Sequence, residues 1–125
     1  MELAVLRKTL KGESRALELL RAQLKTLQVV SRKITGSGFF SKFEISPERR
    51  IDIPDIQFGD VIANITGLAH GAGFLLYLRE GQLDLLEGYS FEEPWPREIV
   101  DFSLSYKNED QRDWGHLGPF LNDWK

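Results

Sequence analysis

Residues 74–86 read FLLYLREGQLDLL, and this stretch decides the fold. Two apolar runs flank a Glu80-Gly81 turn, in which the glycine supplies the positive φ that a two-residue hairpin turn needs. The pattern predicts a β-hairpin that pairs Leu78 with Leu83, Leu76 with Leu85 and Phe74 with Glu87. Because both faces near its middle are largely apolar, we expect the hairpin to lie centrally in a sheet, with a helix covering one side.

The sequence before the hairpin begins with the periodicity of an amphipathic helix. Gly12 interrupts this pattern at a cost of about 1 kcal/mol relative to alanine, so the segment forms either one long helix with a weak point or a short helix followed by a longer one. The pattern continues to about Ile34, where Gly36 and Gly38 end it. We expect the stripe to pack on the protein's own sheet rather than on a membrane. Leucines at spacings of three and four, or sums of these, form the stripe: Leu3, Leu6, Leu10, Leu17, Leu20, Leu24 and Leu27.

The remaining elements have the period-two alternation of strands. Residues 39–45, 61–66 and 99–106 alternate apolar and polar side chains, whereas residues 46–59 contain two prolines and indicate a loop or edge excursion. Segregated helix and strands predict an α+β fold, with a long N-terminal amphipathic helix packed on a mostly antiparallel sheet of four to five strands. We assign residues 1–106 to one domain and expect the tail, 107–125, to dock on it, because the tail carries Trp114, Phe120, Leu121 and Trp124.

Composition excludes several classes of function. The chain has 125 residues and no cysteine, which excludes a disulfide framework, a cysteine zinc site and a thiol nucleophile. It lacks a phosphate-binding glycine loop and a paired-histidine motif, so no cofactor or metal is predicted. Without a long apolar stretch or a signal peptide, we expect a cytoplasmic protein that does not enter a membrane.

The net charge of -3 conceals an uneven distribution. Residues 1–50 hold 11 Lys and Arg against 5 Asp and Glu, a balance of +6. Residues 51–125 hold 5 against 14, a balance of -9. Either a basic helix and an acidic sheet neutralise each other, or the acidic part forms a binding surface. The acidic remainder argues against a nucleic-acid partner.

Glu87 is the residue that most suggests chemistry. Strand alternation places it in line with Leu83 and Leu85, where a buried carboxylate would have a raised pKa. With Tyr89 and His70 nearby, it could form the mouth of a pocket between helix and sheet and act as an acid or base. The alternative is that the face ends, or that a bulge turns Glu87 to the other side.

Residues 87–96, EGYSFEEPWP, combine aromatic rings, carboxylates and two prolines. Rigid aromatics beside charge are typical of interface anchors, because they lose little entropy on binding. The competing interpretation is that Trp95 and Phe91 fold back over the core. The candidate partner-binding residues are Asp84, Tyr89, Glu92, Glu93, Trp95 and Asp101.

Several strings give the chain a resemblance to other proteins. TGSGFF (35–40), GAGFLLY (71–77), LEGY (86–89) and PWP (94–96) resemble a group of small bacterial proteins that has no established activity. The resemblance spans residues 17–106 and implies a bacterial, cytoplasmic protein. It supplies no catalytic residues.

These observations favour a small non-enzymatic protein-binding module, such as an acidic inhibitor or immunity-type partner of a basic protein. The alternative is a small-ligand-binding protein or simple acid/base enzyme that uses His70, Glu87 and Tyr89. A homodimer that hides a strand edge or the leucine stripe is a third hypothesis.

Overall fold

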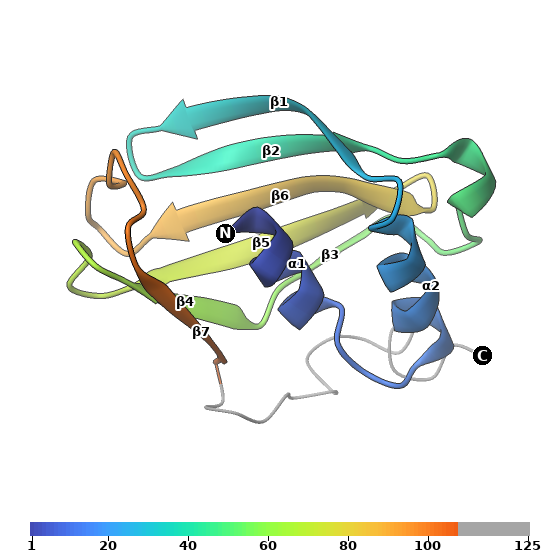
Figure 1. Ribbon diagram of the computed structural model, residues 1–125, viewed down its shortest axis with the longest axis horizontal. Helices are drawn as coiled ribbons and strands as arrows, with labels where there is room; N and C mark the ends of the chain where they lie inside the picture. Colours follow the sequence, from blue (N-terminus) through green and yellow to red (C-terminus); the bar gives the residue numbers. More distant parts are fainter. Residues whose placement is uncertain (108–125) are drawn as a thin grey trace.

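The computed structural model describes residues 1–107, which form two short helices and a seven-stranded sheet (Figure 1). Neighbouring strands pair antiparallel in the order β1-β2-β6-β5-β4-β7, and β3 also pairs with β5. The α+β class and the antiparallel sheet are confirmed, but the sheet is larger than the four to five strands predicted. The elements are α1 (Glu2–Thr9), α2 (Arg15–Gln23), β1 (Gln28–Thr35), β2 (Gly38–Glu44), a 3-10 turn η1 (Pro47–Arg49), β3 (Ile56–Phe58), β4 (Val61–Ile65), β5 (Ala72–Arg79), β6 (Gln82–Ser90) and β7 (Phe102–Tyr106).

The predicted long N-terminal helix is absent. Of the two alternatives left open at Gly12, the second is confirmed, because a short helix, α1, is followed by a separate helix, α2, that is one residue longer. Helix α1 ends at Thr9, Gly12 adopts a φ of 148° in the connection that follows, and the Ser14 hydroxyl accepts the Leu17 N–H to cap the second helix. The Arg21 guanidinium donates to the Leu10 and Gly12 carbonyls at 2.6 and 2.7 Å and so holds the connection closed. The stripe itself packs on the sheet as expected, and its fully buried members are Leu6, Leu10, Leu17 and Leu20.

Residues 28–35, which the helical pattern included, form strand β1 instead. Val29, Val30 and Ile34 are β-branched, and such side chains favour a strand over a helix. The segment pairs with β2 along its whole length, with an irregularity between Val29 and Ser31.

Both helices lie on one face of the sheet, here called the inner face (Figure 1). The predicted alternation of β2 and β4 is confirmed, because Phe39, Phe43, Val61 and Ala63 point inward and are buried. β7 begins at Phe102, three residues later than predicted. The opposite, outer face of the sheet carries the other half of each strand's side chains.

The hairpin turn is confirmed, but its register is wrong beyond the first pair. Leu78 pairs with Leu83, whereas Tyr77 pairs with Leu85, so that Asp84 is an extra residue in β6. Such a bulge moves every later side chain of its strand to the opposite face. Glu87 consequently pairs with Leu75 and not with Phe74.

The predicted docked tail lies outside the described residues apart from Lys107, whose N–H donates to the Asp60 carbonyl at 2.8 Å. Within residues 1–107, neither helix is long and apolar enough to cross a membrane.

Candidate functional site

The outer face of strands β2, β5 and β6 carries a cluster of half-buried side chains that no described helix covers. Register places Phe40 and Leu75 on either side of Glu87, and it places Tyr77 beside Leu85. Together with Tyr89 they form what is called here the outer cluster: Phe40, Leu75, Tyr77, Leu85, Glu87 and Tyr89.

Glu87 lies at the centre of the outer cluster. The Tyr77 hydroxyl donates a hydrogen bond to Glu87 Oε1 at 3.0 Å. Burial, this hydrogen bond and the Glu87 charge together raise the pKa of Tyr77, and burial and the same charge raise the pKa of Tyr89. Among residues 1–107, no lysine or arginine forms an ion pair with Glu87. The carboxylate therefore has aromatic and apolar neighbours and, in this part of the chain, no cation bound to it.

Tyr89 and Phe91 form an aromatic flank beside Glu87. Their rings meet edge-on with centroids 5.6 Å apart, and Phe91 remains 40% exposed. The Tyr89 ring lies over Gly73, where a Cβ would come within 2.5 Å of the ring, so the glycine is needed for this contact. The arrangement keeps the Tyr89 ring flat against the sheet.

The Asp84 carboxylate forms ion pairs within the molecule, with Lys42 and Arg79. It is 7% exposed, and its Oδ1 accepts a charge-assisted hydrogen bond from Lys42. Arg79 Nε lies 3.9 Å from the other carboxylate oxygen, and its guanidinium also lies over the Tyr77 ring, 5.6 Å from the centroid. The bulge thus buries a carboxylate between two cations, which leaves little of it for a partner.

Glu93 contacts His70 through the backbone N–H of His70 and not through its imidazole ring. The Glu93 carboxylate accepts the N–H groups of Ala69 and His70 at 2.9 Å each, and these two bonds lower the pKa of Glu93. Glu92 and His70 are exposed. Glu93 therefore fixes the loop that precedes β5.

Trp95 and Asp101 lie away from the outer cluster. Trp95 packs edge-on against the inner-face ring of Phe39, with centroids 5.3 Å apart, and its backbone N–H donates to the Gly36 carbonyl. Asp101 lines a polar hollow of about 300 Å³ at the end of β4 and β7, beside Asn64 and Thr66. The six predicted partner-binding residues thus occupy several separate places, and of the six only Tyr89 is in the outer cluster.

The predicted pocket residues do not share a helix–sheet pocket. Glu87 and Tyr89 are on the outer face, His70 is in a loop, and Phe74 and Leu86 fill the inner side of the hairpin with less than 2% exposure. Of the two interpretations of Glu87, the pocket position is wrong, and the alternative in which a bulge turns Glu87 to the other side is confirmed, with the bulge at Asp84.

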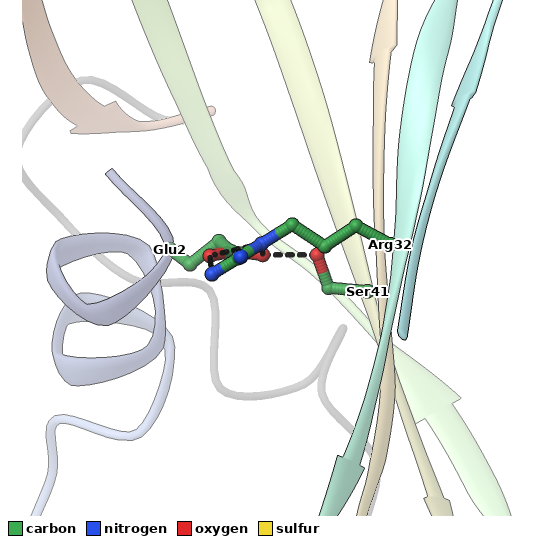
Figure 2. Close-up of polar contacts among 3 residues, drawn as sticks. All are labelled: Glu2, Arg32 and Ser41. Carbon is green, nitrogen blue, oxygen red and sulfur yellow. Dashed lines mark hydrogen bonds and ion pairs between the residues drawn. The ribbon is translucent and has the colours of Figure 1, made fainter. Parts of the chain in front are cut away.

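A hollow of about 240 Å³ does lie between α1 and the sheet, but different residues line it. There Glu2 at the start of α1 meets Arg32 of β1 and Ser41 of β2 (Figure 2). The Arg32 guanidinium binds the carboxylate through Nε at 3.1 Å and Nη2 at 2.7 Å, and the Ser41 hydroxyl also donates to it. The sequence pattern does not predict this site, because it places Arg32 and Ile34 in a helix. Apolar side chains complete the lining: Met1, Ile34, Phe39 and Ile99.

Glu2 has a lowered pKa in spite of its environment. Burial by itself would raise the pKa, but the hydrogen bonds from Arg32 and Ser41 and the Arg32 charge outweigh it. The ionised carboxylate is therefore favoured in the folded protein, and it links α1 to the strands at one end of the sheet.

We expect Arg32→Ala to lower the free energy of unfolding by about 1 kcal/mol at neutral pH. Because the folded-state pKa of Glu2 is lowered, its contribution is present above the unfolded pKa and is lost as pH falls through the folded value. The difference between wild type and variant in urea unfolding should therefore shrink on acidification. Arg15→Ala, which breaks the exposed pair with Glu18, is the control and should cost less. A difference that does not change with pH would contradict the role of Glu2.

Among the described residues, no group of histidine, aspartate and glutamate side chains is arranged to hold a metal ion. Comparison with protein-family models, with curated proteins and with solved structures finds no match. The resemblance to small bacterial proteins stays a prediction.

Proposed function

We propose that this chain is a protein-binding module that recognises a basic partner through the outer cluster. The supporting observation is Glu87, a half-buried carboxylate that lies among aromatic and apolar side chains without an ion-pair partner in residues 1–107. An inhibitor or immunity-type protein, which covers a basic enzyme or toxin, is the form of module that this chemistry fits best.

A guanidinium or ammonium group matches this site in charge and shape. Hydrogen bonds between ionised groups are about twice as strong as neutral ones. The faces of tyrosine and phenylalanine also attract cations. The chain contains an example of its own, because the Arg79 guanidinium lies 5.6 Å from the centroid of the Tyr77 ring. An arginine of a partner placed over Glu87 would gain both kinds of contact.

The surroundings of Glu87 have the composition of an interface core. Partly buried apolar and aromatic side chains, among them Phe40, Leu75 and Tyr89, retain some area that a partner can bury. The balance of -9 in residues 51–125 would accelerate the approach of a basic protein. We place the interface on the outer cluster and leave Trp95 and Glu93 to structural roles.

The alternative, a ligand-binding protein or acid/base enzyme, has less support. Its three residues share no pocket, and the inner face behind them is filled by Phe74, Leu76 and Leu86.

The test uses an arginine probe and its neutral isostere. The peptide Ac-Gly-Arg-Gly-amide is titrated into isotope-labelled protein, and backbone amide shifts are followed by NMR. We expect shifts centred on β2, β5 and β6 that weaken as salt is added. Glu87→Gln should weaken binding about tenfold, because it removes a charge-assisted hydrogen bond.

Two controls define the result. The citrulline peptide has the shape of the arginine peptide without its charge and should bind at least several-fold more weakly. Glu98→Gln removes an exposed carboxylate elsewhere and should bind like wild type. Equal binding of arginine and citrulline, or unchanged binding by Glu87→Gln, would refute the proposal.

A further inference from the structure

Strand β1 is an edge of the sheet, and its outward side is unpaired within the described residues. It stands first in the sheet order, with β2 on one side and no described element on the other (Figure 1). Its eight residues are long for a strand left at an edge. Unpaired N–H and C=O groups along such a strand can pair with another chain.

β1 also exposes apolar side chains. Val30 is 48% exposed and Ile34 is 68% exposed, which places both among the few large hydrophobic residues that the described chain leaves in solvent. Proteins usually protect an edge with charge, and Arg32 and Lys33 lie in the middle of β1. Because both charges are positive, they repel a basic neighbouring strand and do not repel an acidic one.

A hollow lies where alternate side chains of an added strand would project. Arg32 pairs with Ser41 and points to the inner face, where it and Ile34 line the hollow of about 240 Å³ beside α1. Glu2 occupies Nε and Nη2 of the Arg32 guanidinium, whereas Nη1 makes no hydrogen bond within residues 1–107. Lys33 points to the outer face beside Phe40. A strand added beside β1 would therefore meet Arg32 and the apolar hollow on the inner face of the sheet, and Lys33 on the outer face.

We infer that the edge of β1 accepts an extended acidic segment of a partner protein as an additional strand. In this mode of recognition, main-chain hydrogen bonds supply affinity and side-chain sites supply specificity. A carboxylate next to Arg32 or Lys33 would gain a charge-assisted bond, and an apolar side chain would enter the hollow beside Ile34. This inference concerns the edge of the sheet and does not rest on Glu87.

A second copy of this chain fits the edge less well. Arg32 and Lys33 lie near the middle of β1, so that extensive pairing of β1 with itself would bring the like charges of the two copies within about two positions of each other. Like charges opposite each other on paired strands are destabilising. The charge of the edge thus selects an acidic segment over self-association.

The probe is the peptide Ac-Val-Glu-Val-Glu-Val-Glu-Val-amide, titrated into the full chain. We expect amide shifts and slowed hydrogen exchange confined to β1 and its neighbour β2. A version of the peptide with alternate backbone amides N-methylated on its pairing edge should not bind, because it cannot complete the ladder of hydrogen bonds. Lys33→Glu should weaken binding about tenfold, whereas Lys25→Glu, an exposed charge outside β1, should leave it unchanged.

Three outcomes would overturn the inference. Equal binding of the N-methylated peptide would show that main-chain pairing is not used. Unchanged affinity in Lys33→Glu, with the thermal unfolding of the variant intact, would remove the charge argument. Self-association in sedimentation that also slows amide exchange along β1 would assign the edge to a second copy. Glu87→Gln should bind the peptide like wild type, so that failure of the proposed basic-partner site is distinguishable from failure here.

Discussion

Replacing Gln23 with leucine is expected to lower the free energy of unfolding by about 3 kcal/mol. Gln23 is fully buried at the end of α2, and its amide joins three parts of the chain. Nε2 donates to the carbonyls of Arg49 and Gly81, and Oε1 accepts the N–H of Leu83, all at 2.9 Å. Leucine has a similar size and fills the space. The decrease in the free energy of unfolding therefore measures the loss of the hydrogen bonds and not the creation of a cavity.

The size of this effect follows from what remains unpaired. The Gly81 carbonyl still accepts the Ile51 N–H at 3.0 Å, but the side-chain partners of Leu83 and Arg49 are lost. A buried group left unsatisfied costs about 1–3 kcal/mol, which applies in full to the Leu83 N–H, whereas the Arg49 carbonyl is only partly buried. Urea unfolding provides the measurement, and Gln57→Leu on an exposed position of β3 is the control, expected within about 0.5 kcal/mol of wild type. A loss below about 1 kcal/mol for Gln23→Leu would show that water replaces the amide.

Gln23→Glu tests the accepting oxygen of the Gln23 side chain separately from its donating nitrogen. The glutamate keeps an acceptor for Leu83 but, when ionised, donates nothing and buries a charge. We expect it to be less stable than the leucine variant at neutral pH and to recover part of the loss in acid. No such recovery is expected for Gln23→Leu.

Gln23 also shows where prediction from sequence ends. Its position on the helix is predictable, but its partners lie up to 60 residues away along the chain. Apolar periodicity identifies the side chains that face a core, and the buried leucines of α1 and α2 are confirmed on that basis. It does not predict which polar side chain of the same face will satisfy a distant turn.

Two of the errors in the predicted fold have local physical causes. The helical pattern extends into β1 because Val30 and Ile34 continue the spacing of three and four from Leu27, although their β-branching favours a strand. The bulge at Asp84 inserts one residue into an otherwise regular alternation. A single sequence with a Leu-Asp-Leu-Leu run does not distinguish a bulge from a continuous strand, because the pairing partner decides between them.

The bulge also decides how the candidate site differs from the prediction. Glu87 and Tyr89 are neighbours on one strand face, as predicted, but that face points away from the helices. Trp95 and Glu93 stand out by composition alone, and composition does not distinguish an interface anchor from a ring that closes the core or a carboxylate that caps a loop. The function proposed for the outer cluster therefore depends on the shifted register.

Gly81→Ala is expected to destabilise the protein by about 3 kcal/mol, and the reason is steric. Gly81 has a φ of 75°, and a Cβ placed there would lie 2.0 Å from the backbone oxygen of Ile51. The left-handed conformation costs a non-glycine residue about 1–2 kcal/mol, and displacing a backbone carbonyl adds about as much again. The variant should also expose the Ile51 amide to faster hydrogen exchange, since that N–H donates to the Gly81 carbonyl.

Gly67→Ala is the matched control. Gly67 has a φ of 105°, but nothing lies within 4 Å of a Cβ there, so it should lose only the conformational part, about 1 kcal/mol. The double variant of Gly81→Ala with Gln23→Leu tests whether the two residues act together. Because Gly81→Ala displaces the residue whose carbonyl accepts from Gln23, the combined loss should be less than the sum of the separate losses. Equal losses at the two glycines, together with full additivity, would mean that the hairpin tip is not held by its contacts with Ile51 and Gln23.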